Sequence, residues 1–276
     1  MDQDSREEPR YVEAVLNYLV DTGEKPEIYL YPPPPGIPQR TGHYTTSTVP
    51  ICDGRALLPQ LSLDKQGFLL QRHETKVVDF YDEHEVQAVY YLEVEQLVQA
   101  VTGAAKVVVF DHTRRSASAS KRAEHGAQEP VRMAHNDYTP RSGPQRVRDL
   151  LAADEAEARL QRRFAEINVW RPIRGPVEDT PLAVCDGQTI APQDLVATDL
   201  KYPDRTGEVY TLTFNPHHRW YYFPHMQRNE ALLLKGYDSL TDGQTRFTAH
   251  TAFDDPTALP HAAARESIEI RTLVFF

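Results

Sequence analysis

The feature that most constrains the fold is a series of short β-rich runs in the last third of the chain. From residue 181 onward, Pro, Gly, Asp and Asn separate these runs, and such residues favour turns. The runs are LAVCDG, EVYTLTF, RWYYFP, ALLLKGY, RFTAHTAF and SIEIRTLVFF. Many short strands with this punctuation are typical of a sandwich, a jelly roll or a barrel.

Helices are expected mainly in the first two-thirds of the chain. Residues 84–101 and 144–165 place apolar side chains at helical spacing, and Gly103 is suited to ending the first of these helices. Two β-branched and aromatic segments between and after them, residues 107–110 and 167–173, predict strands. We therefore predict a mainly β protein with flanking helices, built on a double-stranded β-helix (jelly-roll, cupin-like) core.

Three further segments give expectations that the structure can test. Residues 11–20 carry apolar side chains at helical spacing and predict a short N-terminal helix. The proline run at residues 32–36 excludes a helix or a central strand, and it predicts an extended arm at the surface. Residues 115–130 are rich in Ser, Ala and charge and predict a mobile loop.

Composition excludes several classes of partner. The net charge of −10 disfavours contact with phosphate backbones, so we expect no nucleic-acid partner. No stretch approaches the ~20 apolar residues of a membrane span. The acidic start, MDQDSREEPR, does not resemble a signal or transit peptide. Cys52 and Cys185 match no metal or redox spacing, and the simplest expectation is a cytoplasmic protein.

The first chemical signal is the triplet His135-Asn136-Asp137. Residues at i and i+2 of a strand point to the same face, so this imidazole and this carboxylate could bind one metal ion. A second histidine would complete the 2-His-1-carboxylate triad of non-haem Fe(II) oxygenases, which leaves positions open for a cosubstrate and O2. The triplet alone is weak evidence, because a surface salt bridge has the same pattern.

The third ligand is sought among the later histidines. His250 is favoured because it lies in a strand-like run and precedes an arginine-bearing terminal strand. His225, in an aromatic segment 88 residues after Asp137, is the main alternative. The other candidates, which we expect in a turn or in a buried strand, are His112, His217 and His218.

The terminal strand offers a site for a dicarboxylate. Arg265, Ser267, Glu269 and Arg271 alternate along it and share one face. A planar guanidinium can bind a carboxylate through two hydrogen bonds, and a hydroxyl can add a third. Arg265 is favoured because Ser267 follows two residues on. Arg271 lies deeper in the strand and must be paired, either with the cosubstrate or with an acid such as Glu269.

Four other residues complete the predicted site. Asn168 could donate to a cosubstrate carboxylate and Trp170 could form a wall of the pocket, although both suit an ordinary core equally well. Tyr138 follows the predicted ligands and could line the entrance. Arg114 could bind an acidic substrate group, with structural pairing to Asp111 as the alternative.

The order H-x-D, distant His and R-x-S resembles that of the 2-oxoglutarate-dependent Fe(II) oxygenases. Six segments, in the same order, resemble one family of fungal and bacterial natural-product enzymes: VVVFDHTRR, HNDYTP, INVWRPI, HRWYYFPHMQRNEALLLKGYDS, HTAFDDP and RESIEIRTLVF. That family includes gibberellin desaturases, the methoxylation component of cephamycin biosynthesis and an endoperoxide-forming meroterpenoid oxygenase. The resemblance covers roughly residues 85–276.

The resemblance implies a mechanism and a set of roles. It implies Fe(II), 2-oxoglutarate and O2 as cofactors, with the iron held by His135, Asp137 and His250 and the cosubstrate held by Arg265 or Arg271. The substrate would be a small secondary-metabolite intermediate that undergoes hydroxylation, desaturation or oxidative cyclisation. Two alternatives stay open: a metal-dependent cupin-type enzyme that does not use 2-oxoglutarate, and a non-catalytic binding protein on the same fold.

The expected organisation is one oxygenase domain over residues 1–276. Residues 1–84 would hold the N-terminal helix and the extended arm, and residues 85–276 the recognisable oxygenase region. The proline-rich arm at residues 32–36 could be a linker, a flap or a contact with a second subunit, and the last of these would make the protein a homodimer.

Overall fold

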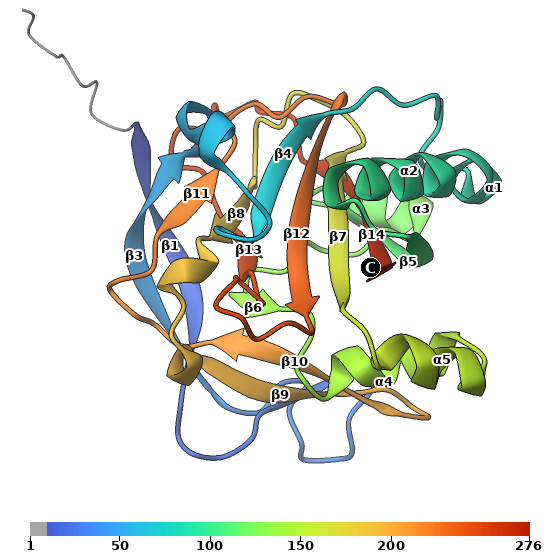
Figure 1. Cartoon of the computed structure of the whole chain (residues 1–276). Helices are drawn as coiled ribbons and strands as arrows, with labels where there is room; N and C mark the ends of the chain where they lie inside the picture. The colour runs from blue at the N-terminus through green and yellow to red at the C-terminus, as the bar shows by residue number, and fades with distance from the viewer. Residues whose placement is uncertain (1–9) are drawn as a thin grey trace, which may run out of the picture.

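The computed structural model describes residues 10–276, which form two β-sheets with helices at one side and one end (Figure 1). The larger sheet contains β1 (Tyr11–Val20), β2 (Glu27–Tyr29), β3 (His43–Asp53), β6 (His135–Asn136), β8 (Leu182–Cys185), β9 (Leu195–Lys201), β10 (Thr206–Leu212), β11 (Trp220–Tyr222) and β13 (His250–Ala252). The smaller sheet contains β4 (Phe68–Arg72), β5 (Lys106–Ser116), β7 (Phe164–Pro172), β12 (Glu230–Asp238) and β14 (Glu266–Phe275).

The strand orders are β1-β3-β11-β8-β13-β6-β10-β9-β2 in the larger sheet and β4-β12-β7-β14-β5 in the smaller one. Each of the six β-rich runs predicted after residue 181 contains a strand, and the two predicted earlier strands are β5 and β7. The predicted mainly β fold with flanking helices is therefore confirmed. No helix within residues 10–276 is long and apolar enough to cross a membrane.

The helix predicted over residues 11–20 is wrong, because this segment is β1. Alternate side chains, including Val12, Ala14 and Leu16, are buried, while Glu13 between them is exposed. The whole strand pairs antiparallel with β3. The spacing of the apolar residues fits a strand, with a period of two, as well as a helix. The pairing of all ten residues with β3 makes the segment a strand.

The helix predicted over residues 84–101 is confirmed. It consists of α1 (Glu83–Glu85), a π turn over Val86–Tyr90 and α2 (Tyr91–Thr102), and it ends at Gly103 with φ 70°. Gly103 adopts this left-handed conformation at little steric cost, so it stops the helix where the sequence predicted.

Two other predicted segments need correction. The helix expected over residues 144–165 is two helices, α4 (Ser142–Leu150) and α5 (Ala153–Leu160), because Leu151 is extended with φ −110° and ψ 158°. The loop expected over residues 115–130 contains α3 (Ala119–His125), whose first turn is capped by the Ser118 hydroxyl. Residues 32–36 lie outside any helix or strand and are mostly exposed.

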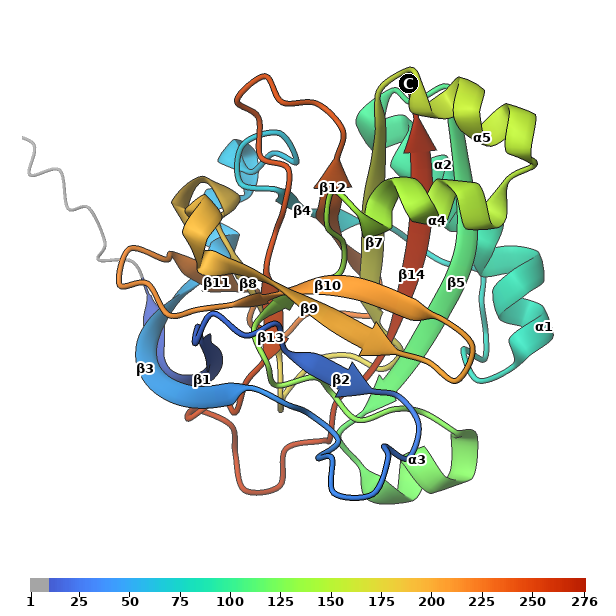
Figure 2. The same ribbon diagram turned by 90° about the horizontal axis from the view of Figure 1, so that it is seen from below.

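The helices cover one face of the smaller sheet and leave its other face for the larger sheet. Helix α2 packs against β5 and β14, and its Val94 and Val98 belong to the same buried apolar cluster as Ile167 and Val169 of β7. The intervening side chains of β7 face the opposite way, and Trp170 packs with Leu182 of β8. Helices α4 and α5 lie beside the end of the smaller sheet, as the view from below shows (Figure 2). The space between the sheets is therefore where polar side chains of β7 and β14 meet the larger sheet.

Short turns complete the described chain. They are the 3₁₀ turns Gly54–Gln60, Gly187–Thr189 and Pro192–Asp194.

Candidate metal centre

Three potential ligands converge between the two sheets. His135 on β6 and His250 on β13 are direct register partners on neighbouring strands, and Asp137 follows β6 in the next turn. One ligand atom from each of the three lies within 4.8 Å of the other two. The imidazole centroids are 4.5 Å apart, and His135 Nε2 lies 3.4 Å from Asp137 Oδ1. A single metal ion could contact all three side chains. Within residues 10–276 no other cluster of three His, Cys, Asp or Glu side chains meets the same distance limit.

The two histidines are suited to binding a metal ion. His135 Nδ1 lies 2.7 Å from the carbonyl oxygen of Met133, which can only accept, so Nδ1 carries the proton and Nε2 keeps its lone pair. His250 Nδ1 is buried and has no hydrogen-bond partner within the described chain. Burial, and then the nearby His135, lower the pKa of His250 to about 3. His250 is therefore neutral at physiological pH, which is the form that coordinates metals.

Asp137 is held as a carboxylate. Burial by itself would raise its pKa, but the contact with His135 and the charge of Arg271 keep that pKa well below its ordinary value. Asn168 Nδ2 donates to Asp137 Oδ2 over 2.7 Å, and Arg271 Nε lies 3.4 Å from the same oxygen. These contacts fix the orientation of the carboxylate.

Asn136, the middle residue of the triplet, was not predicted to have a role. Its side chain is buried, and Nδ2 donates to the carbonyl oxygens of Tyr138 (2.7 Å) and Gly236 (2.9 Å). Its Oδ1 accepts from the backbone N–H of Thr248 at 3.1 Å. Asn136 therefore ties the turn that carries Asp137 to β12 and to the segment just before β13. The signal in the sequence was its alternation with two ligands, which placed it on the opposite face.

A small pocket surrounds the three potential ligands, and it brings together six of the ten predicted site residues. The predicted ones are His135, Asp137, Trp170, His250, Arg265 and Arg271. Glu269, predicted as a possible partner of Arg271, also lines it, together with three residues that had no predicted role: Arg115, Val131 and Leu182. Asn168 joins this group through its hydrogen bond to Asp137 rather than by lining the pocket.

The two candidate arginines for the cosubstrate have different surroundings: Arg265 directly precedes β14, and Arg271 lies within it. Arg271 is surrounded by acids: Asp111 at 3.2 Å, Glu269 at 3.3 Å and Asp137 at 3.4 Å. Arg265 is 3% exposed and donates one hydrogen bond, from Nη1 to the carbonyl oxygen of Thr180. Its Nε is buried without a partner, and no acid of residues 10–276 pairs with it. Burial, followed by the repulsion of Arg115, lowers the pKa of Arg265 to about 9.

Three predicted residues do not reach the pocket. Arg114 donates to the carbonyl oxygen of Phe80 (2.6 Å) and to Glu83 (2.9 Å), so it serves the pairing that was the alternative expectation for it. Tyr138 packs in a separate apolar cluster with Val147 of α4. Ser267 is buried on β14 but does not line the pocket.

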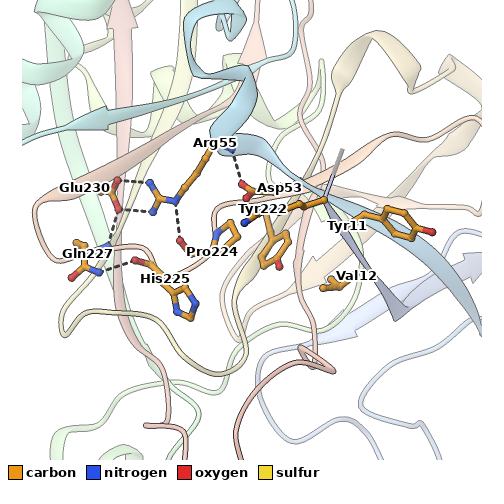
Figure 3. Close-up of a pocket in the computed structure, with 10 residues that line it drawn as sticks. Tyr11, Val12, Asp53, Arg55, Tyr222, Pro224, His225, Gln227 and Glu230 are labelled. Atoms are coloured by element: carbon orange, nitrogen blue, oxygen red, sulfur yellow. Dashed lines mark hydrogen bonds and ion pairs between the residues drawn. The ribbon is translucent and has the colours of Figure 1, made fainter. Parts of the chain in front are cut away.

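The alternative histidines lie elsewhere. His225 lines a different and larger cleft of about 590 Å³, beside Tyr222 and the ion pair of Arg55 with Glu230 (Figure 3). His218 Nε2 lies 3.0 Å from Asp194, and His112 Nδ1 lies 2.8 Å from the Tyr91 hydroxyl. The larger cleft contains no cluster of metal-binding side chains from residues 10–276, so its size does not make it the metal centre.

Comparison with known proteins identifies relatives over nearly the whole chain. A family model described as "Oxidoreductase/YMDC permease-like domain" matches residues 16–275. The Fe(II)/2-oxoglutarate-dependent dioxygenase nvfI of Aspergillus novofumigatus (strain IBT 16806) is 35% identical over 263 residues, which are 92% of this chain and 93% of the relative. The hydroxylase/desaturase efuI of Hormonema carpetanum is 35% identical over 255 residues, 84% of this chain and 85% of the relative.

The fold has a solved counterpart. The structure titled "iron and alpha-ketoglutarate-dependent endoperoxidase NvfI with different conformation" superposes with a TM-score of 0.87 and 31% sequence identity. The match covers 96% of this chain and 98% of that chain. A jelly-roll core, as predicted from the sequence, is the fold that such oxygenases share.

Proposed function

We propose that this chain, which belongs to the Fe(II)/2-oxoglutarate-dependent dioxygenases of natural-product biosynthesis, holds its iron through His135, Asp137 and His250 and its 2-oxoglutarate through Arg265. The assignment of the cosubstrate to Arg265 rests on the surroundings of its guanidinium group. Its guanidinium is buried beside the three potential ligands with no acidic partner within residues 10–276. A buried charge without a partner is costly, and a bound carboxylate would neutralise it.

Arg271 is the less suitable residue for the cosubstrate. Three acids already surround it, and two of them, Asp137 and Glu269, line the same pocket. We assign it to holding Asp137 ionised and in place, together with Asn168.

Fe(II), 2-oxoglutarate and O2 are the cofactors of this family, and together they supply the oxidising power that removes hydrogen from a carbon of the substrate. The donor set fits iron, because two imidazoles and one carboxylate make up the facial triad of non-haem Fe(II) enzymes. The protein's part is to orient the cofactors and to exclude water, and Val131, Trp170 and Leu182 provide apolar walls for this purpose.

The reaction is the oxidation of a small molecule. We propose hydroxylation, desaturation or oxidative cyclisation of a secondary-metabolite intermediate, in line with relatives whose names are hydroxylase/desaturase and endoperoxidase. Neither alternative, a cupin-type enzyme without 2-oxoglutarate or a non-catalytic binding protein, finds support in the names of these relatives.

The test is an anaerobic titration of the protein with Fe(II) and 2-oxoglutarate, followed by visible absorbance. Chelation of 2-oxoglutarate to iron gives a weak charge-transfer band. We expect the band in the wild type and in Arg114→Gln, a control that lies outside the pocket. We expect it to be lost in His135→Ala and to need far more 2-oxoglutarate in Arg265→Gln.

The possible failures of this test have different meanings. Iron binding without a band in the wild type would remove 2-oxoglutarate from the mechanism and favour a cupin-type enzyme. A band that persists in His135→Ala would overturn the assignment of the ligands.

A cytoplasmic location, a single domain over residues 1–276 and a homodimer contacting through residues 32–36 stay proposals. Sedimentation of the full chain, with and without alanines in place of the prolines of this arm, tests the dimer.

A further inference from the structure

The pocket contains a second arginine that has no acidic partner in the described part of the chain. Arg115 on β5 lines the same pocket as Arg265 and the three potential metal ligands. Its Nη1 donates to Gln128 Oε1 (3.2 Å) and to the carbonyl oxygen of Glu129 (2.8 Å). Its Nε and Nη2 make no hydrogen bond to residues 10–276, and it forms no ion pair with the acids of that part of the chain.

The pairing of β5 with β14 brings the two arginines to the same face. Arg115 is the register partner of Ser267, and the N–H of Ala117 donates to the carbonyl oxygen of Arg265 at 2.9 Å. Arg265 and Ser267 are two residues apart, so Arg265 and Arg115 are diagonal neighbours on adjacent strands. Their like charges repel each other, which is one cause of the lowered pKa of Arg265.

Among the described residues that line the pocket, one acid besides the proposed ligand Asp137 lies beside them, and it already has partners. Glu269 accepts a hydrogen bond from Asn168 Nδ2 at 2.9 Å and lies 3.3 Å from Arg271 Nη2. Within residues 10–276, the pocket therefore contains two guanidinium groups that pair with no carboxylate, Arg115 and Arg265, and one arginine, Arg271, that is paired with acids. A single 2-oxoglutarate carboxylate bound by Arg265 alone would leave Arg115 without an acidic partner.

We propose that Arg115 is a second carboxylate-binding residue of this pocket. The inference rests on the proposed function, because it takes Arg265 as the residue that binds 2-oxoglutarate. A guanidinium presents two parallel N–H groups in the geometry that a carboxylate accepts, and Arg115 has Nε and Nη2 free for this purpose. The carboxylate belongs either to 2-oxoglutarate, shared between Arg115 and Arg265, or to an acidic organic substrate.

The experiment compares Arg115→Gln and Arg115→Lys with Arg114→Gln. Arg114 is the adjacent residue on β5, and its side chain points to the opposite face, where it binds Phe80 and Glu83. It does not line the pocket, so Arg114→Gln is a matched control for the loss of one arginine from this strand. The first measurement is the dissociation constant of 2-oxoglutarate from the anaerobic Fe(II) protein, read from the charge-transfer band. The second is the thermal stabilisation of the Fe(II)·2-oxoglutarate protein by a panel of aromatic and polycyclic carboxylic acids, each paired with its methyl ester.

Two results support the proposal and identify the source of the carboxylate. A dissociation constant for 2-oxoglutarate at least tenfold higher in Arg115→Gln, with partial recovery in Arg115→Lys, assigns the carboxylate to the cosubstrate. The alternative result is an unchanged dissociation constant for 2-oxoglutarate, together with acids that stabilise the wild type but not Arg115→Gln. If the methyl esters of those acids stabilise neither protein, the carboxylate belongs to the organic substrate.

The proposal is overturned if the constant changes less than twofold and no acid of the panel distinguishes the wild type from Arg115→Gln. This failure is separate from failure of the proposed function. The latter would show itself in the wild type, as the absence of the band before any variant is compared.

Discussion

The side-chain nitrogen of Asn168 lies 2.7 Å from Oδ2 of Asp137 and so joins the smaller sheet to the turn that follows β6 of the larger sheet and carries a proposed metal ligand. The same nitrogen also donates to Glu269 Oε1 at 2.9 Å. Asn168 is fully buried in β7, where its backbone cannot shift without moving the centre of the sheet. The contact therefore holds the Asp137 carboxylate in a fixed position relative to the β7–β14 pair.

Replacing Asn168 should weaken iron binding without removing a ligand. We expect Asn168→Ala to lower Fe(II) affinity by ~10–100-fold, the usual cost of losing a residue that orients a metal ligand. Anaerobic calorimetric titration with Fe(II) measures this change. Asn215→Ala is a matched control, because Asn215 Nδ2 donates to the carboxylate of Asp194 at 3.0 Å and neither residue lines the pocket. Equal losses in the two variants would contradict the role given to Asn168.

The third ligand can be decided by comparing two histidines. We expect His250→Ala to reduce Fe(II) affinity by more than the ~100-fold upper limit for residues that merely orient ligands. His225→Ala should change it less than about twofold, since His225 lines the separate cleft. The same Fe(II) titration reads both, with circular dichroism as the check on folding. A larger loss in His225→Ala would reverse the assignment.

Removal of the metal should lower the stability of the protein. A ligand that binds the folded chain alone adds ~2.7 kcal/mol when present at 100 times its dissociation constant. Urea unfolding under argon, with Fe(II) at that excess and again with a chelator, should differ by this amount in the wild type. In His135→Ala the two curves should coincide. Equal shifts in both proteins would mean that iron stabilises the chain at some other site.

The fold was predictable where local pattern and tertiary structure agree. The run from His84 to Gly103 has helical spacing, a capping glycine and no competing strand partner, so helix α2 forms where expected. Residues 11–20 fit both periods, and the sequence alone does not show that β3 lies alongside them. Strand pairing over such a distance in sequence is a tertiary effect that overrides local propensity.

The spacing of residues in the sequence predicted the proposed ligands of the candidate site, but it predicted fewer of the residues that support them. His135, Asp137 and His250 come together, and the parity of the last strand places Arg265, Glu269 and Arg271 in one pocket. Parity also distinguishes Arg114 from Arg115, but nothing local shows which face of β5 points inward. The tertiary structure decides this, because α1 lies on the face that carries Arg114 and the pocket lies on the face that carries Arg115.

Arg265 and Arg271 should respond oppositely to loss of charge in the metal-free protein. Arg271→Gln leaves three neighbouring carboxylates without their cation, and breaking a buried ion pair costs ~3–5 kcal/mol. Arg265→Gln removes a buried cation that has no acidic partner within residues 10–276, so stability should stay within about 1 kcal/mol of the wild type or rise. Urea unfolding measures both. A large loss in Arg265→Gln with none in Arg271→Gln would exchange their roles.

Glu166 on β7 predicts a pH dependence of stability in the metal-free protein. Both of its carboxylate oxygens are buried without a partner within residues 10–276, and burial raises its pKa well above the ordinary value of 4.5. Between those two pKa values the folded chain keeps a proton that the unfolded chain releases. The unfolding free energy contributed by Glu166 is therefore full below pH 4.5, and it falls by about 1.4 kcal/mol per pH unit between pH 4.5 and the raised pKa of the folded protein.

Glu166→Gln removes this proton while keeping the shape of the side chain. The variant should match the wild type near pH 4.5 and become progressively more stable than it as the pH rises above 5 toward the raised pKa of Glu166. Urea unfolding of the metal-free proteins at each pH measures the difference. Glu13→Gln, on the exposed face of β1, should show no such divergence. A constant offset between Glu166→Gln and the wild type across this range would mean that Glu166 is ionised in the folded protein and has a cation or water that satisfies it.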